Sequence, residues 1–100
     1  ATARALGERL AQEQPDAVVT SPYLRARETG EAIARAARLE AEPHEGLGFD
    51  ATPETLREAV DGRGKTVVAV GHQPSCSEIV LALTGREVRF APGDVQELDL

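Results

Sequence analysis

The stretch Lys65-Thr-Val-Val-Ala-Val-Gly-His-Gln-Pro-Ser75 decides how this chain folds. Its first part, Thr66 to Val70, is a β-branched and almost wholly apolar run, which predicts a strand covered on both faces. Pro74 suits the first turn of a helix, so the stretch predicts a strand, a turn and a helix in succession. Gly71 and His72 then lie at the carboxyl end of the strand, where open α/β sheets bind ligands beside helix N-termini.

A second stretch repeats this design. Ser21-Pro-Tyr-Leu-Arg-Ala-Arg-Glu-Thr29 follows a short apolar strand, Ala17 to Thr20, and also opens a helix, with Ser21 as its expected cap. Because the carboxyl ends of parallel strands meet at one edge of a sheet, we expect Arg25 and His72 to converge there on an anion. The competing interpretation of His72 is a cap or a satisfied polar contact. Arg27 lies about 200° around the helix from Arg25 and is expected at the surface.

The remaining elements complete an α/β pattern. Apolar spacing, caps and turn residues predict four helices: from the start of the chain to Gln14, from Pro22 to about Leu39, from Pro53 to about Val60 and from Pro74 to Gly85. They also predict strands near Ala41, at Glu87–Phe90 and at Val95–Leu100, of which the last two are joined by a Pro92-Gly93 turn. This order predicts a three-layer α/β/α sandwich with a mostly parallel sheet, whose end strands can be antiparallel.

Composition limits the function classes. One hundred residues with 41% hydrophobic content make a single domain. The net charge of −6 and the scarcity of aromatic residues disfavour binding to nucleic acid or to an anionic membrane. The single cysteine, Cys76, lies on the apolar face of its helix and is expected in the core, and no residue pattern predicts a metal or another cofactor. Without a signal peptide or an apolar span, we expect a cytoplasmic location.

The two motifs together resemble those of the histidine phosphatase superfamily, which has the phosphoglycerate mutase-like fold. The residues that carry the resemblance are Ser21-Pro22-x-x-Arg25-Ala26-x-x-Thr29 after one strand and Gly71-His72 after a later one. The short layout and Gly-His-Gln-Pro followed by Ser75 resemble the small phosphohistidine phosphatases of the SixA type. The resemblance extends over essentially the whole chain.

The resemblance implies a phosphate pocket of two histidines and two arginines, in which one histidine attacks phosphorus. Arg25 would be the second arginine and His72 the second histidine, which stabilises the transferred phosphoryl group. The family's nucleophile and first arginine come from an Arg-His-Gly motif on its first strand, and this sequence contains only His44 and His72, neither in that context. We therefore expect an N-terminally truncated domain over residues 1–100, which lacks the family's first central strand and is inactive by itself.

Two other functions stay open at this point. A non-catalytic phosphate or phosphoprotein-binding module would use Arg25 and His72 for their charge alone. A sugar-phosphate mutase or bisphosphatase would need acid-bearing insertions, for which Glu45 is the only nearby candidate. His44, in a loop beside Pro43, is expected to be a solvated residue rather than a catalytic one. In each case the expected partner is a phosphorylated substrate, and the phosphatase interpretation points to a phosphohistidine protein.

Overall fold

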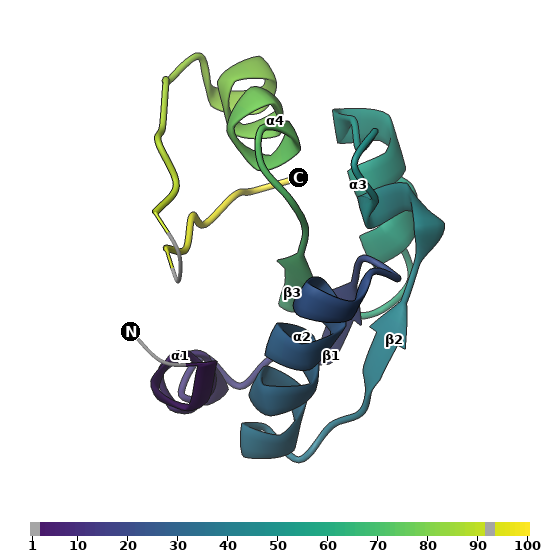
Figure 1. Cartoon of the computed structure of the whole chain (residues 1–100), viewed down its shortest axis with the longest axis vertical. Helices are drawn as coiled ribbons and strands as arrows, with labels where there is room; N and C mark the ends of the chain where they lie inside the picture. The colour runs from purple at the N-terminus through teal and green to yellow at the C-terminus, as the bar shows by residue number, and fades with distance from the viewer. Residues whose placement is uncertain (1–2, 92–93) are drawn as a thin grey trace.

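The computed structural model describes residues 3–91 and 94–100. Helices alternate with short strands along most of the chain (Figure 1). In chain order the elements are α1 (Ala3–Ala11), β1 (Ala17–Thr20), α2 (Leu24–Ala36), β2 (Ala41–Pro43), the short 3₁₀ helix η1 (Glu45–Leu47), α3 (Pro53–Val60), β3 (Val67–Val70) and α4 (Ser75–Thr84). The predicted α/β class is confirmed, and the predicted helix over 53–60 has the bounds expected from the sequence.

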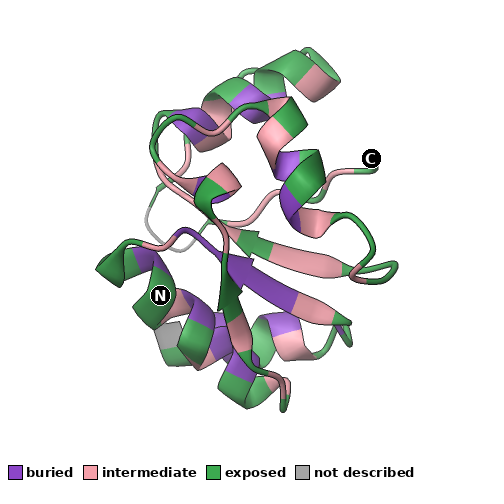
Figure 2. Ribbon diagram, turned by 90° about the vertical axis from the view of Figure 1, so that its right-hand side faces the viewer, coloured by how far each residue is buried: buried purple, intermediate pink, exposed green. Residues whose placement is uncertain are grey.

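The three strands form a parallel sheet in the order β2-β1-β3. Val18 of β1 is paired with Ala41 on one side and with Val68 on the other. In Figure 2 the middle strand is the buried one, and Val18 and Val19 have no exposed surface. The prediction that the strand beginning near Thr66 is covered on both faces is confirmed only in part, because Val68 and Val70 pack against one core cluster and Val67 against the other, whereas Ala69 is exposed. β3 is an edge strand of this sheet, and its residues are half-buried or exposed because only one of its edges is paired.

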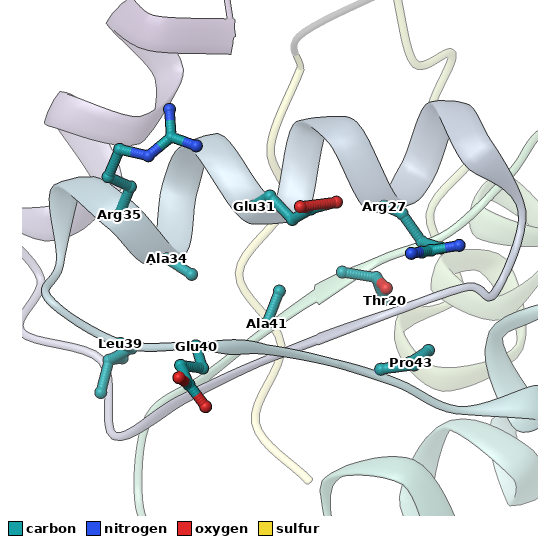
Figure 3. Close-up of a pocket in the computed structure, with 9 residues that line it drawn as sticks. All are labelled: Thr20, Arg27, Glu31, Ala34, Arg35, Leu39, Glu40, Ala41 and Pro43. Atoms are coloured by element: carbon teal, nitrogen blue, oxygen red, sulfur yellow. The ribbon is translucent and has the colours of Figure 1, made fainter.

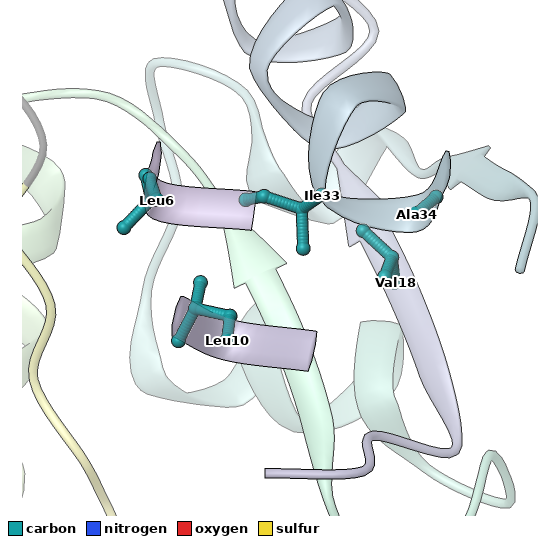
Figure 4. Close-up of a cluster of buried hydrophobic side chains, with 5 residues drawn as sticks. All are labelled: Leu6, Leu10, Val18, Ile33 and Ala34. Atoms are coloured by element: carbon teal, nitrogen blue, oxygen red, sulfur yellow. The ribbon is translucent and has the colours of Figure 1, made fainter. Parts of the chain in front are cut away.

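Helices cover both faces of the sheet, which gives the three predicted layers. On one face, Val18 forms a cluster with side chains of α1 and α2, namely Leu6, Leu10, Ile33 and Ala34 (Figure 4). On the other face, Val19 packs with Leu47, Leu56, Ala59 and Ile79 from η1, α3 and α4. Each of the larger aliphatic side chains stabilises the fold by roughly 1.5–3 kcal/mol through its burial.

Two glycines allow α2 to approach its neighbours closely. A Cβ atom on Gly7 of α1 would lie 2.9 Å from the carbonyl oxygen of Ala32, and one on Gly30 would lie 2.0 Å from Cγ2 of Thr20. Neither position has room for a methyl group. The absence of these two side chains therefore sets the distance from α2 to α1 and to β1.

Asp16 fixes β3 beside β1 at the amino ends of the strands. Its Oδ2 atom accepts hydrogen bonds from the backbone N–H groups of Lys65, at 2.8 Å, and Thr66, at 3.1 Å. The Asp16 N–H group donates to the Thr66 carbonyl at 2.7 Å. Gly64 has a φ of +123°, and a Cβ atom there would lie 2.4 Å from that of Asp16. This contact is non-local and helps to set the register of the two strands.

The C-terminal segment is not part of the sheet. Residues 86–91 and 94–100 form no helix or strand, so the predicted strands at 87–90 and 95–100 are wrong, and the predicted Pro92-Gly93 turn lies outside the described residues. Val95 packs against the cluster on the α1/α2 face and Leu98 against the one on the α3/α4 face. The apolar residues of this segment thus serve as packing anchors instead of as the inward face of a paired strand.

Candidate functional site at the carboxyl edge of the sheet

The turns that follow β1 and β3 meet through two side chains. The Nε2 atom of His72 lies 2.7 Å from the hydroxyl oxygen of Ser21. Ser21 is fully buried, and its N–H group donates to the Val70 carbonyl at 2.8 Å. The two stretches that the sequence singled out are therefore in direct contact at the carboxyl edge of the sheet.

Ser21 has a different role from the one predicted for it. Helix α2 begins at Leu24 rather than Pro22, and its N-cap residue is Tyr23, which makes no side-chain capping bond. The Ser21 hydroxyl instead accepts a hydrogen bond from the Tyr23 N–H group at 3.2 Å and faces His72. Its place at the end of a strand, directly before the helix, indicated a cap and gave no sign of a partner 51 positions away.

Two aromatic rings contact the imidazole of His72. The Phe49 ring stacks on it, with centroids 4.1 Å apart and planes inclined by 21°. The Tyr23 ring meets it edge-on, with centroids 5.7 Å apart and an angle of 69°. Sequence reasoning did not place Phe49 in the site. One signal was available in the sequence: Phe49 is one of only two phenylalanines, and it lies in a polar, glycine-containing loop where no core position was expected.

Helix α4 holds both His72 and Phe49 by its first turn. The Cys76 N–H group donates to the His72 carbonyl at 2.9 Å. The buried hydroxyl of Ser75 donates to the Phe49 carbonyl at 2.6 Å. The backbone of each residue of the stacked pair, His72 and Phe49, is thus hydrogen-bonded to the start of α4.

Arg25 lies in the first turn of α2, and its side chain is exposed. Within the described part of the chain it makes no ion pair or hydrogen bond, and the first turn of α2 contains no acidic residue. The free N–H groups of this turn and the guanidinium both favour an anion. Convergence of Arg25 with His72 on one anion stays a prediction. Arg27 is exposed, as the sequence predicted.

The other three reactive candidates that the sequence offered are His44, Glu45 and Cys76. His44 caps η1, because its Nδ1 atom accepts a hydrogen bond from the Gly46 N–H group at 2.9 Å. Glu45, in the first turn of η1, is exposed. Burial raises the pKa of the Cys76 thiol, an effect that a hydrogen bond with the Gly71 backbone partly opposes. A thiol with a raised pKa is a poor nucleophile near neutral pH.

A separate cavity of about 410 Å³ lies between α2 and β2 (Figure 3). Its lining residues are Thr20, Arg27, Glu31, Ala34, Arg35, Leu39, Glu40, Ala41 and Pro43. Neither Arg25 nor His72 is among them, so the cavity is distinct from the contact between the two turns.

Among residues 3–91 and 94–100, no group of three or more His, Cys, Asp or Glu side chains could hold a metal ion. No helix in that part of the chain is long and apolar enough to cross a membrane.

Comparisons with known proteins place the chain beside the family that its motifs resemble. Residues 1–48 match the family model of the histidine phosphatase superfamily (branch 1), a range that contains Arg25 but ends before His72. A search of curated proteins found no match. Among solved structures, the fold is similar to a crystal structure from Agrobacterium tumefaciens whose protein is assigned as the phosphohistidine phosphatase SixA, with a TM-score of 0.66 and 25% sequence identity.

That structural match covers 83% of this chain and 56% of the other chain, so this chain spans little more than half the length of that relative. The family match includes the Ser21–Thr29 stretch, and the structural match extends the likeness over most of the chain. Together the two findings support the assignment of this chain to the histidine phosphatase superfamily, with a likeness to its SixA-type members.

Proposed function

We propose that this chain is the larger part of a phosphatase domain that removes a phosphoryl group, with phosphohistidine as the substrate, through a phosphorylated histidine on the enzyme. The observation that carries the proposal is the 2.7 Å contact between His72 and Ser21, which joins the two motif-bearing turns. The superfamily match and the likeness to a protein assigned as SixA support the same reaction class.

Arg25 and His72 supply positive charge and N–H donors in the proposed reaction. A phosphoryl group in transfer spreads negative charge over its three equatorial oxygens, and fixed donors stabilise that charge. The exposed guanidinium of Arg25 at the start of α2 is available to bind those oxygens. His72 is held in one orientation by Ser21 and Phe49, so little reorganisation is needed when the substrate binds.

The nucleophile is proposed to be the histidine of an Arg-His-Gly motif on a strand upstream of Ala1. Its imidazole nitrogen attacks phosphorus, the bond from phosphorus to the leaving nitrogen or oxygen breaks, and the leaving group takes up a proton. Water then attacks the phosphorus of the enzyme phosphohistidine, which frees the histidine and releases phosphate. Among the residues that the structure describes, no strand pairs with the outer edge of β3, which supports this arrangement because a further strand can pair there next to His72.

Assays of two forms of the protein test the proposal. Residues 1–100 alone should not turn over an activated aryl phosphate or a phosphohistidine peptide. A longer form, in which a strand ending in Arg-His-Gly precedes Ala1, should turn over both without a metal, so a chelator should have no effect. His72→Ala in the longer form should lower kcat/KM by about 10²-fold or more, by comparison with the loss of other groups that stabilise transition-state charge.

Turnover by residues 1–100, with an acid-labile phosphoryl group on His44 or His72, would contradict the proposed nucleophile. Phosphate binding by both forms, without turnover by the longer one, would instead support the non-catalytic binding module. The capping contact of His44 with Gly46 argues against His44 as the nucleophile.

A further inference from the structure

Two of the three aromatic residues of the chain gather on His72. Tyr23 precedes α2 and Phe49 follows η1, and their ring centroids lie 4.7 Å apart with an interplanar angle of 47°. Both rings also contact the imidazole. The third aromatic residue, Phe90, contacts no other ring in the described part of the chain. We call Tyr23 and Phe49 the aromatic pair.

The aromatic pair is exposed, although the two core clusters of the domain are built from aliphatic side chains. Tyr23 retains 52% and Phe49 57% of its accessible surface, and Leu24, the residue after Tyr23, retains 68%. Large apolar side chains that lie together on a surface mark a site of contact with another molecule. The domain does not require these rings for its core, because both faces of the sheet are covered without them.

The position of the pair relates it to the proposed phosphoryl site. Tyr23 is the N-cap residue of α2, so its ring is attached next to the free N–H groups of the first turn, and Arg25 is two residues further on. Phe49 covers one face of the His72 ring. The organic group that carries a phosphoryl group bound by Arg25 and His72 would therefore lie beside the aromatic pair.

The geometry favours a flat group over a bulky one. Aromatic rings interact best in offset-stacked or edge-to-face arrangements with centroids 4.5–7 Å apart. Because the two rings are inclined by 47°, a third planar ring can stack on one and meet the other with its edge. A saturated ring of similar size gains the same apolar contact area but lacks the electrostatic part of this interaction.

We propose that the aromatic pair selects substrates whose phosphoryl group is carried on a planar ring, namely the imidazole of phosphohistidine or an aryl ester. This inference rests on the proposed function, because it assumes that Arg25 and His72 bind the phosphoryl group. It adds that Tyr23 and Phe49 recognise the leaving group. Phosphoryl groups on aliphatic hydroxyls would be bound less well.

Four phosphonates that cannot be hydrolysed test the selection by binding alone. They are methylphosphonate, cyclohexylmethylphosphonate, benzylphosphonate and imidazol-4-ylmethylphosphonate, each titrated into residues 1–100 with the NMR signals of His72 and Tyr23 as the readout. A ring contact of this type corresponds to about a 3- to 10-fold gain in affinity. We expect benzylphosphonate to bind about 3- to 10-fold more tightly than cyclohexylmethylphosphonate. The imidazole compound separates a preference for phosphohistidine from one for aryl esters.

Substitutions assign the preference to the aromatic pair. Phe49→Leu and Tyr23→Leu keep an apolar side chain and remove the ring, so each should bring the ratio of benzyl to cyclohexylmethyl affinity towards one. Phe90→Leu is the matched control and should leave that ratio unchanged.

The outcomes distinguish this inference from the proposed function. Equal affinities of the unsubstituted protein for the planar and saturated rings would overturn the inference, whereas binding that still requires Arg25 and His72 would leave the proposed function intact. No binding of any of the four compounds would overturn the inference alone, whereas methylphosphonate binding that is unaffected by Arg25→Ala and His72→Ala would overturn both.

Discussion

The Nε2 atom of His72 and the hydroxyl oxygen of Ser21 lie 2.7 Å apart although 51 positions separate the two residues in the sequence. Ser21 has no exposed surface, so its hydroxyl holds the imidazole from inside the domain. The contact makes Ser21 a positioning residue for the proposed phosphate site, acting through His72.

Ser21→Ala should weaken phosphate binding without unfolding the domain. It removes the contact with His72 and leaves the Tyr23 N–H group without its acceptor, so we expect a loss of about 1–3 kcal/mol of stability. Inorganic phosphate should bind about 2- to 10-fold more weakly, as measured by NMR titration of residues 1–100. The control is Ser77→Ala, whose hydroxyl accepts a hydrogen bond from the Gln73 side chain. An unchanged phosphate affinity in Ser21→Ala would show that the contact is purely structural.

Substitution of each arginine by alanine should separate Arg25 from Arg27. Both side chains are exposed, but they point in directions about 200° apart around α2. Arg25→Ala should lower the kcat/KM of the longer, active form by at least 10²-fold, because it removes a donor to the transition state. Arg27→Ala should leave activity within about 2-fold. Equal losses from the two substitutions would mean that the wrong arginine was assigned to the site.

Gly30→Ala should destabilise the domain in spite of the higher helix propensity of alanine. In an exposed helix the change stabilises by about 1 kcal/mol, but here the new Cβ atom would lie 2.0 Å from Cγ2 of Thr20. We expect a net loss of about 1–3 kcal/mol in urea unfolding. Thr20→Ser removes the obstructing methyl group, so Gly30→Ala should cost less in that background. The same cost in both backgrounds would exclude this clash as the cause.

The Cys76 thiol should make stability fall at alkaline pH. Burial raises its pKa in the folded state, so the folded protein holds the thiol proton at pH values where the unfolded chain has lost it. The contribution is fully present below the ordinary thiol pKa, about 8.5, and is lost as the pH rises through the higher folded value. Urea unfolding from pH 7 to pH 10, compared with that of Cys76→Ala, isolates the effect. Parallel stability curves for the two proteins would contradict it.

The sequence by itself determined the local structure and the identity of the motif-bearing turns. The helix over 53–60 begins with a reciprocal bond between Thr52 and Thr55 and needs no distant partner. Gly85 ends α4 in a left-handed conformation that glycine adopts without strain. The β-branched run before His72 and the strand before Ser21 were likewise evident from residue type, because these signals act over a few positions.

Only the tertiary structure decided how those pieces combine. An apolar run such as 67–70 looks the same in a central strand and in an edge strand, and the difference depends on which neighbours pair with it. The segments 87–90 and 95–100 on either side of Pro92-Gly93 suggested strands, yet Val95 and Leu98 are anchored on opposite faces of the domain. The contacts of His72 with Ser21 and Phe49 join residues that are 51 and 23 positions apart, and the packing of the whole sheet, rather than any local preference, brings them together.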